Sequence, residues 1–322
     1  MPEKLLEVVD LKTYFYTTKG IVKAVDGISF TLNKGEVLGL AGESGCGKST
    51  TAYSLIRLVP PPGRIVSGKI VFEGKDLLKL SDEEFRREIR WRKISMVFQG
   101  AMNALNPVYT VGDQIAEVLM LHKGLTKKEA IEEAKKLLAM VGIDPRRVRS
   151  YPHELSGGMK QRVMIAMALA LNPPLVIADE PTTALDVVVQ AQIMNLMKKL
   201  QREYNMSIIL ITHDLSLIAE IADKVAIMYA GKIVEFGTSE QIYGNPQHPY
   251  TQALLRSIPR LHGEITKLEW IPGTPPDLIS PPPGCRFAPR CKRVMDICNK
   301  EEPPVIEVEP GHYVSCWLHA KK

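Results

Sequence analysis

Hydrophobic residues occur along this chain in two alternating patterns. Short continuous apolar runs, which are typical of buried parallel strands, end at polar or glycine-rich segments. Stretches with apolar residues at helical spacing lie between these runs. The predicted buried strands are residues 37–41, 94–98, 175–178 and 207–212, and the predicted helices include 51–58, 111–122 and 187–204. This alternation predicts an α/β fold with a mostly parallel core sheet.

A second group of predicted strands lies outside the alternating series. These strands are residues 5–11, 22–32 and 68–73, and a predicted hairpin joins 225–229 to 232–235. An aromatic trio, Tyr14-Phe15-Tyr16, separates the first two strands. Such rings can stack on an adenine base, and they can equally serve as core or edge-strand aromatics. The sequence leaves both interpretations open.

Residues 101–172 carry helical periodicity with no intervening strand. Thr126–Glu129 is a capping box that opens a helix, and Gly142 closes it. Ser156 is placed to cap a further helix that runs to Leu171. The pattern predicts a helical subdomain inserted between core strands.

A phosphate-binding motif, G-x-x-x-x-G-K-[ST], joins the strand at 37–41 to the helix that follows. Its residues are Gly42, Glu43, Ser44, Gly45, Cys46, Gly47, Lys48, Ser49 and Thr50. Glycines let the backbone approach phosphate oxygens, and the helix N-terminus adds about half a positive charge. Lys48 can reach the β- and γ-phosphates, and the Ser49 hydroxyl can hold Mg²⁺. Cys46 occupies a free position, and we interpret it as a filler thiol.

Polar residues directly follow three other buried strands: Gln99, the pair Asp179-Glu180, and His213. The carboxyl ends of strands line the ligand crevice of an open α/β sheet, so we expect these side chains near the nucleotide. Asp179 can orient Mg²⁺ through its shell, and Glu180 can polarise the attacking water as a general base. For His213 we favour a role near the γ-phosphate over a purely structural one.

Ser156-Gly157-Gly158 begins the helix that runs to Leu171. Two glycines in the first helical turn are costly as structure. They are explained if backbone N–H groups must contact an anion, and a flexible cap is the alternative.

Composition describes a globular protein large enough for one or two domains. The chain has 322 residues, 45% of them hydrophobic and 24% charged, and a net charge of +5. So modest a charge can help at an anionic membrane surface but does not indicate nucleic-acid binding. No apolar stretch is long enough to span a bilayer, and the chain starts without a signal-peptide pattern. We therefore expect a cytosolic protein whose membrane role needs partner chains.

The composition changes after Pro259, where proline becomes dense and four cysteines appear. The dense prolines, at positions 272, 275, 276 and 281–283, predict a stretch that resists helix and regular sheet. The cysteines Cys285, Cys291, Cys298 and Cys316 have the spacing C-x5-C-x6-C-x17-C. A reducing cytosol disfavours disulfides. A segment so poor in apolar residues needs another crosslink, such as a bound metal, in order to fold. Four thiolates suit zinc or an iron–sulfur cluster, and the spacing lacks the C-x2-C pairs usual in zinc ribbons.

The ordered motifs from the phosphate loop to His213 resemble the nucleotide-binding subunit of ABC transporters over about residues 5–258. The resemblance implies an ABC-type P-loop domain with a mostly parallel core sheet, an antiparallel β subdomain and an inserted helical subdomain at about 101–172. It implies ATP hydrolysis with Mg²⁺ held by Ser49 and Gln99. It also implies a second ATPase subunit that contacts ATP in trans.

The same resemblance assigns roles to individual residues. Phe15 is the best match to the adenine-stacking aromatic, with Tyr14 or Tyr16 possible. Gln99 matches the Q-loop, Asp179 and Glu180 the Walker B pair, Asp186 the D-loop and His213 the switch histidine. Leu155–Met159 match the signature, which contains Ser156, Gly157 and Gly158.

Three stretches look like the narrower group of oligopeptide/dipeptide importer ATPases: residues 103–107, 248–255 and 284–291. This likeness implies two related ATPase subunits, expected to be paralogues, beneath two transmembrane permease subunits. An extracytoplasmic peptide-binding protein would feed them, and the ATPases would lie at the cytoplasmic face of the cell membrane.

The likeness also implies two parts, an ATPase domain at 1–258 and a C-terminal extension at 259–322. In the extension Cys285, Cys291, Cys298 and Cys316 would hold a structural 4Fe–4S cluster, with zinc as the alternative. We expect this cluster to lie outside the motifs that bind ATP, so that Cys291→Ser disorders residues 285–316 but leaves ATP binding near normal.

The sequence leaves alternatives to peptide import. A non-transport ABC ATPase of DNA repair or translation usually carries a coiled-coil insertion or two cassettes, whereas this sequence has one phosphate loop and no sustained heptads. An importer of another solute, such as an oligosaccharide or nickel, and an iron or redox sensor using the cysteine segment are the remaining alternatives.

Overall fold

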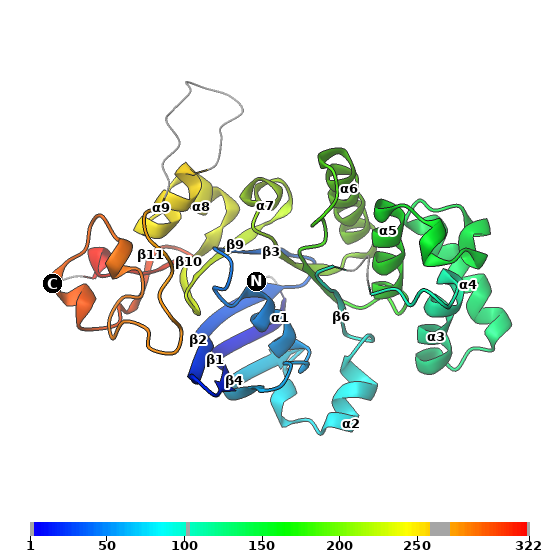
Figure 1. Ribbon diagram of the computed structural model, residues 1–322, viewed down its shortest axis with the longest axis horizontal. Coiled ribbons are helices and arrows are strands. Elements are labelled where there is room, and N and C mark those ends of the chain that lie inside the picture. Colours follow the sequence, from blue (N-terminus) through cyan, green and yellow to red (C-terminus); the bar gives the residue numbers. More distant parts are fainter. Residues whose placement is uncertain (1–2, 101–103, 258–270, 321–322) are drawn as a thin grey trace. The chain divides into compact units, whose positions relative to one another are not determined.

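The computed structural model describes residues 3–100, 104–257 and 271–320. Two compact units make up the chain (Figure 1). The first unit contains Met1–Leu78 and Thr212–Lys322, and the second contains Lys79–Ile211. Asn103 and residues 259–270, which belong to the predicted motifs and extension, lie outside the described residues.

The first unit contains a four-stranded antiparallel sheet in the order β2-β1-β4-β5. Its strands are β1 (Lys4–Thr17), β2 (Gly20–Asn33), β4 (Gly63–Phe72) and β5 (Lys75–Asp76). The predicted end of the first strand was wrong, because β1 continues through the aromatic trio to Thr17. The chain reverses between Thr17 and Gly20, where the Thr17 hydroxyl donates to the Gly20 carbonyl at 2.8 Å. The trio is therefore part of a strand.

A second set of strands in this unit carries the phosphate loop. The buried strand β3 (Val37–Ala41) pairs in parallel with β9 (Lys224–Tyr229), which forms the predicted hairpin with β10 (Lys232–Thr238). Helix α1 (Lys48–Leu55) follows the loop. Three helices were not predicted: α7 (Leu215–Ile221), α8 (Ser239–Gly244) and α9 (Pro249–Arg256). Gly39 of β3 lets α7 pack closely, since a Cβ there would lie 2.3 Å from Ile218 Cγ2.

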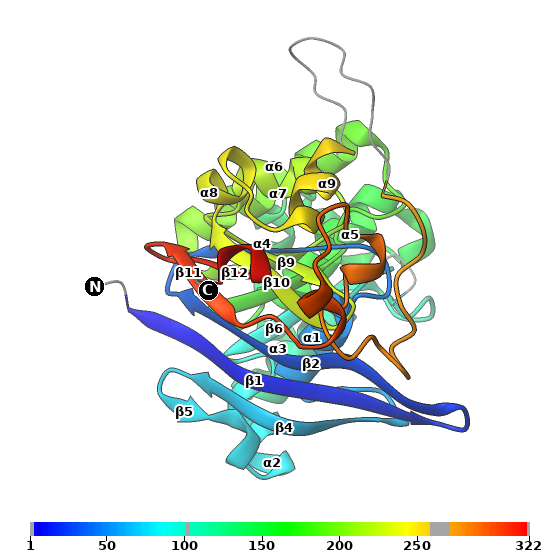
Figure 2. The same ribbon diagram turned by 90° about the vertical axis from the view of Figure 1, so that its left-hand side faces the viewer.

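The C-terminal segment continues this set of strands (Figure 2). Strand β12 (His312–Ser315) pairs with β10 and with β11 (Val305–Glu309), both antiparallel. The prolines at 272–283 were predicted to resist helix and sheet, and residues 271–283 form neither. Strands β11 and β12 lie beyond that stretch. Pro303, Pro304 and Pro310 precede or follow the two strands, so they remove no ladder hydrogen bond from within them.

The second unit contains three parallel strands in the order β8-β7-β6, all predicted from their apolar runs. They are β6 (Ile94–Val97), β7 (Leu175–Asp179) and β8 (Ser207–Ile211), and every residue in them is buried. A short helix α2 (Asp82–Glu84) precedes them. No helix in the described part of the chain is long and apolar enough to cross a membrane.

The helices of the second unit follow the predicted series. They are α3 (Val111–Lys123), α4 (Lys127–Met140), α5 (Gly157–Ala168) and α6 (Val187–Tyr204). The capping box of α4 is confirmed, because the Thr126 hydroxyl accepts from Glu129 N–H and the Glu129 carboxylate accepts from Thr126 N–H. Helix α5 begins at the predicted place but ends three residues before Leu171.

Candidate functional site

The phosphate loop turns sharply between β3 and α1, and two glycines make that turn possible. Gly42 has φ 147° and Gly47 has φ 107°, values that L side chains rarely adopt. A Cβ at Gly42 would lie 2.1 Å from the Met228 carbonyl oxygen, and one at Gly47 would lie 2.2 Å from the Ala24 carbonyl oxygen. Neighbouring backbone therefore excludes any larger residue at either position.

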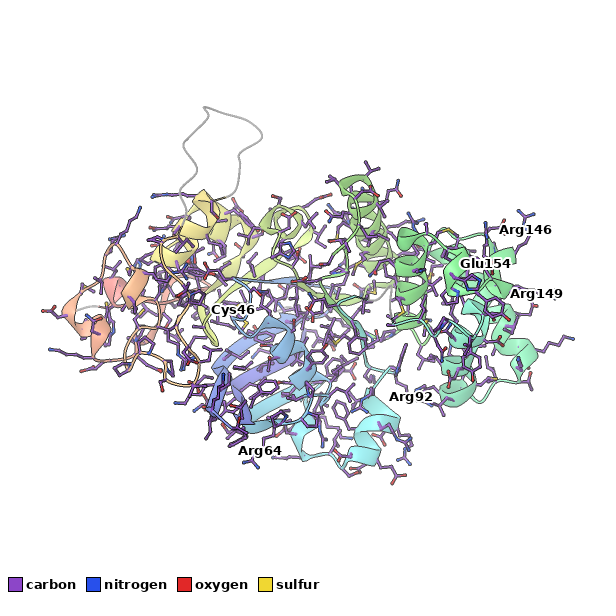
Figure 3. The ribbon with its side chains drawn as sticks, viewed as in Figure 1. Cys46, Arg64, Arg92, Arg146, Arg149 and Glu154 are labelled. Carbon is purple, nitrogen blue, oxygen red and sulfur yellow. The ribbon has the colours of Figure 1, made fainter. Side chains whose placement is uncertain are left out.

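Lys48 lies across this loop with its side chain buried. Its ammonium donates to the carbonyl oxygens of Gly42 at 2.7 Å and Glu43 at 3.0 Å. Burial raises the pKa of the Cys46 thiol, which opposes a thiolate there and agrees with its interpretation as a filler. Figure 3 labels Cys46 in this loop. Ser44 and Gly45 are exposed, whereas Ser49 and Thr50 are half-buried in the first turn of α1.

Each ring of the aromatic trio has its own contact within the first unit. The Tyr14 hydroxyl donates to Asp26 Oδ1 at 2.5 Å. The Arg64 guanidinium lies 4.0 Å from the centre of the Tyr16 ring, and Figure 3 labels this arginine. Phe15 lies against Gly63, where a Cβ would be 2.6 Å from Phe15 Cε1. Phe15 is half-buried. Its role as the adenine-stacking ring stays a prediction.

Gln99 and Glu180 are brought together in the second unit. Gln99 Nε2 donates to Glu180 Oε2 at 2.8 Å, and the Thr183 hydroxyl donates to the same oxygen at 2.9 Å. Glu180 has φ 47°, an uncommon left-handed conformation that turns the chain just after β7. Asp179, the last residue of β7, is fully buried. The two adjacent carboxylates thus have different environments.

The signature and the D-loop form two helix starts that meet at Val189. The exposed Ser156 caps α5 by accepting from Met159 N–H at 3.3 Å, and Asp186 caps α6 by accepting from Val189 N–H at 2.9 Å. A Cβ at Gly158 would lie 2.7 Å from Val189 Cγ1. Close packing of α5 and α6 therefore also requires Gly158, a reason that the sequence did not reveal.

The predicted site residues are divided between the two units. Phe15, the phosphate loop and the exposed His213 belong to the first unit. The second unit holds Gln99, Asp179, Glu180, Ser156, Gly157, Gly158 and Asp186. Three short-helix residues of this unit, Arg146, Arg149 and Glu154, are labelled in Figure 3.

The four C-terminal cysteines are free thiols in one neighbourhood. The Cys285 N–H donates to the Cys298 carbonyl oxygen at 2.8 Å. Burial raises the pKa of Cys285 to about 11, and the charges of the other three cysteines raise it further. Their sulfur chemistry suits a thiolate-bound metal. In the ranges that the structure describes, however, no group of three or more His, Cys, Asp or Glu side chains is arranged to hold a metal ion.

The segment that carries the four cysteines contacts the phosphate loop through an arginine. Arg290, one residue before Cys291, donates to both carboxylate oxygens of Glu43 in the phosphate loop. Arg286 donates to Asp26 and to the Ala230 carbonyl. Neither arginine was predicted to have a role. A usable signal was present, since two arginines four residues apart flank the apolar Phe287.

Comparisons with known proteins agree with these motifs. The family model described as "ABC transporter" matches residues 25–183, and "Oligopeptide/dipeptide transporter, C-terminal region" matches residues 234–298. The dipeptide transport ATP-binding protein DppD of Bacillus subtilis is 52% identical over 99% of this chain and 96% of its own length. The oligopeptide transport ATP-binding protein OppD of Salmonella typhimurium is 50% identical over 97% of this chain and 93% of its own length.

Solved structures give the same fold. A dimeric ATP-binding cassette, MJ0796, in a post-hydrolysis state bound to ADP and Pi, matches with a TM-score of 0.65 and 28% identity. The match covers 73% of this chain and 99% of that one. Together with the relatives that are similar over nearly their whole length, these findings show that the chain belongs to the ATP-binding proteins of ABC transporters, in the group with the oligopeptide/dipeptide transporter C-terminal region.

Proposed function

We propose that this ABC ATPase couples ATP binding and hydrolysis to the uptake of dipeptides or oligopeptides through partner membrane subunits. The observation that carries the proposal is the likeness to peptide transport ATP-binding proteins at about 50% identity along almost the whole chain, C-terminal region included. The relatives reported above are peptide transport proteins, which favours peptides over nickel or an oligosaccharide as the solute and transport over a non-transport role.

In the proposed reaction the chain's own residues bind the nucleotide and move one proton. The phosphate loop and Lys48 bind the phosphates, and Phe15 stacks on adenine. Glu180 accepts a proton from the attacking water as general base. Gln99 and Thr183 orient the Glu180 carboxylate through the hydrogen bonds that the structure shows. His213 would contact the γ-phosphate.

Mg²⁺ fits the donor chemistry of these residues. The Ser49 hydroxyl and the Gln99 amide oxygen are neutral oxygen donors, and the buried Asp179 carboxylate can orient the ion through its shell. When bound, the ion neutralises charge on the phosphate oxygens. Gln99 can serve both proposed roles, because its amide nitrogen faces Glu180 while its oxygen is left to accept.

The proposed working unit is a dimer of cassettes, formed with a paralogue or a second copy. The chain has one phosphate loop and one signature, and Ser156, Gly157 and Gly158 would contact the ATP held by the partner's phosphate loop. Asp186 would lie at the same interface. Val187 and Val188, directly after Asp186, expose 79% and 67% of their surface, as an uncovered interface would.

The proposed membrane contact lies after the Q-loop. Asn106 accepts from Gln114 and donates its backbone N–H to the same side chain, which fixes this loop, while Val108 is 70% exposed. We propose that this region contacts two permease subunits at the cytoplasmic face of the membrane, downstream of an extracytoplasmic peptide-binding protein. Crosslinks from a single cysteine at Val108 to a permease subunit support the contact. Crosslinks confined to the far C-terminus would contradict it.

The four-cysteine segment is proposed to bind a 4Fe–4S cluster as structural support, with zinc as the competing metal. The support is the donor set, four free thiols whose charges influence one another. Anaerobic purification followed by analysis for iron, zinc and acid-labile sulfide tests the proposal. Zinc in stoichiometric amount without iron or sulfide would replace the cluster by a zinc site.

Peptide uptake is tested in cells that depend on an imported peptide for an essential amino acid. Expression of this chain with its neighbouring permease and ATPase genes is expected to restore growth on the peptide. The Lys48→Ala chain serves as the inactive control. Restored uptake of nickel or an oligosaccharide, without uptake of any peptide, would overturn peptides as the solute.

A further inference from the structure

Arg290 of the C-terminal cysteine segment forms an ion pair with Glu43 of the phosphate loop. Arg290 Nη1 donates to Glu43 Oε2 at 2.6 Å, and Nη2 donates to Glu43 Oε1 at 3.0 Å. Two parallel bonds between a guanidinium and a carboxylate are the strongest and most directional ion pair that side chains form. The Arg290 side chain is only 5% exposed and that of Glu43 25% exposed, so solvent screens this pair less than a surface pair.

Arg290 is itself fixed from other directions. Its Nε donates to the Pro272 carbonyl at 2.8 Å, and Nη1 donates to the Tyr229 hydroxyl at 3.2 Å. Phe287, three residues earlier, packs edge-on against Tyr229 with 5.2 Å between ring centres. The guanidinium is therefore held by the protein before it meets Glu43, which limits the entropy lost on forming the pair.

Glu43 is held through its backbone as well as its side chain. The Glu43 N–H donates to the Tyr250 hydroxyl at 3.0 Å, and the Glu43 carbonyl accepts from Lys48. The Tyr250 ring lies 5.3 Å from the Phe287 ring, so both attachments of Glu43 lead to the same aromatic group. The conformation of the loop thus depends on residues far along the chain.

The charge of Glu43 explains why such an attachment matters. A phosphate loop binds a polyanion, and a carboxylate within the loop repels that anion unless a cation compensates it. Arg290 supplies the compensating positive charge from outside the loop and forms an ion pair with the Glu43 carboxylate. Without Arg290, the negative charge of Glu43 would act on the nucleotide phosphates.

We propose that Arg290 is a positioning residue of the ATPase, which neutralises Glu43, holds the phosphate loop in shape and makes nucleotide affinity depend on the C-terminal cysteine segment. The inference rests on nucleotide binding at this loop and deepens the proposed function. It does not depend on which solute is transported.

Nucleotide binding by the purified full-length chain tests the inference, with a fluorescent ATP analogue as the probe. Arg290→Ala is expected to weaken binding on the order of tenfold, the usual effect of losing a hydrogen bond between charged groups. Arg290→Lys keeps the positive charge but cannot make two parallel hydrogen bonds to the carboxylate. It is therefore expected to bind nucleotide more tightly than Arg290→Ala and more weakly than the wild type. Arg293→Ala is the matched control, because it removes the same charge from an exposed position in the same segment.

The decisive variant combines Arg290→Ala with Glu43→Gln. The glutamine removes the uncompensated charge, so the double variant is expected to bind nucleotide more tightly than Arg290→Ala alone. A role of Arg290 in merely holding the segment together would not be rescued in this way. Equal affinities of the double variant and Arg290→Ala would overturn the inference, as would wild-type affinity in Arg290→Ala.

A second pair of variants covers the case in which Arg290→Ala does not fold, and a peptide-uptake assay separates the role of Arg290 from the proposed solute. If Arg290→Ala does not fold, Arg290→Gln with and without Glu43→Gln provides the same comparison, because glutamine also removes the charge but keeps a longer polar side chain. Absence of rescue in that pair again overturns the inference. Peptide uptake is measured separately. A chain that shows the predicted pattern of nucleotide affinities but imports no peptide refutes the proposed solute and leaves the role of Arg290 standing.

Discussion

Gln99 donates its side-chain amide to the Glu180 carboxylate at 2.8 Å. The Thr183 hydroxyl donates to the same carboxylate oxygen at 2.9 Å, so two donors orient this group. Glu180, the residue proposed as general base, is therefore positioned by Gln99. The family resemblance implies that Gln99 is also a Mg²⁺ ligand.

Glu180→Gln is expected to retain ATP binding and to lose about 10²- to 10⁴-fold in kcat, the usual contribution of a general base. The change keeps the size of the side chain but removes its basicity. ATP turnover in the assembled complex and nucleotide binding by the chain are measured together. Wild-type turnover would exclude Glu180 as the base, and Lys48→Ala, which should weaken binding instead, is the contrasting control.

Gln99→Ala tests positioning separately from basicity. Because Thr183 still donates to Glu180, we expect kcat to fall less than in Glu180→Gln. The expected fall is roughly tenfold, the effect of losing one hydrogen bond to a charged group. If Gln99 also holds Mg²⁺, the Mg²⁺ concentration for half-maximal activity rises. An unchanged Mg²⁺ requirement would restrict Gln99 to orienting Glu180.

Mixed complexes test contact of the signature with ATP in trans. Ser156→Arg places a large cation at the start of α5, and Lys48→Ala removes the phosphate-binding lysine. If the working unit is a dimer with shared sites, a complex with one chain of each kind keeps one intact site and regains some ATPase activity. Inactive mixtures of chains that fold and dimerise would argue for sites complete within a single chain.

We expect His248 to lower the free energy of unfolding in acid. Burial and the nearby His319 lower its pKa from 6.5 to about 3. The unfolded chain therefore takes up a proton that the folded chain refuses as the pH falls from 6.5 towards 3. Stability is full above this window, and the group costs about 2 kcal/mol at pH 5.

The variant His248→Asn removes this titration and keeps an acceptor for Tyr250 N–H, which His248 Nδ1 now caps. The free energy of unfolding of the variant is expected to change less between pH 8 and pH 5 than that of the wild type. Denaturant titrations at the two pH values provide the measurement. The same change with pH in both proteins would contradict the assigned pKa.

Cys291→Ser is expected to loosen the segment that carries Arg290 and so to weaken nucleotide binding as well. The sequence alone predicted normal ATP binding for this variant. Limited proteolysis reports the order of the segment, and nucleotide affinity reports its effect on the loop. Normal affinity together with a loosened segment would show that Arg290 keeps its place without the cysteine.

The sequence by itself determined the parts whose signal is local. Apolar runs defined the parallel strands, because a strand buried on both faces needs little polar surface. Spacing identified the phosphate loop, and neighbouring backbone atoms leave no room for a Cβ at Gly42 or Gly47. Capping residues such as Thr126 and Ser156 marked helix starts through bonds that span three residues.

Only the tertiary structure decided which distant residues meet. Arg290 and Glu43 are 247 positions apart, and no periodicity or motif links them. The pairing of β12 with β10 likewise joins residues about 80 positions apart, and strand pairing of this kind depends on an edge that the rest of the fold provides. Ion pairs and edge pairing are set by distance in space, so the cysteine segment looked separate in the sequence and proved to be attached to the phosphate loop.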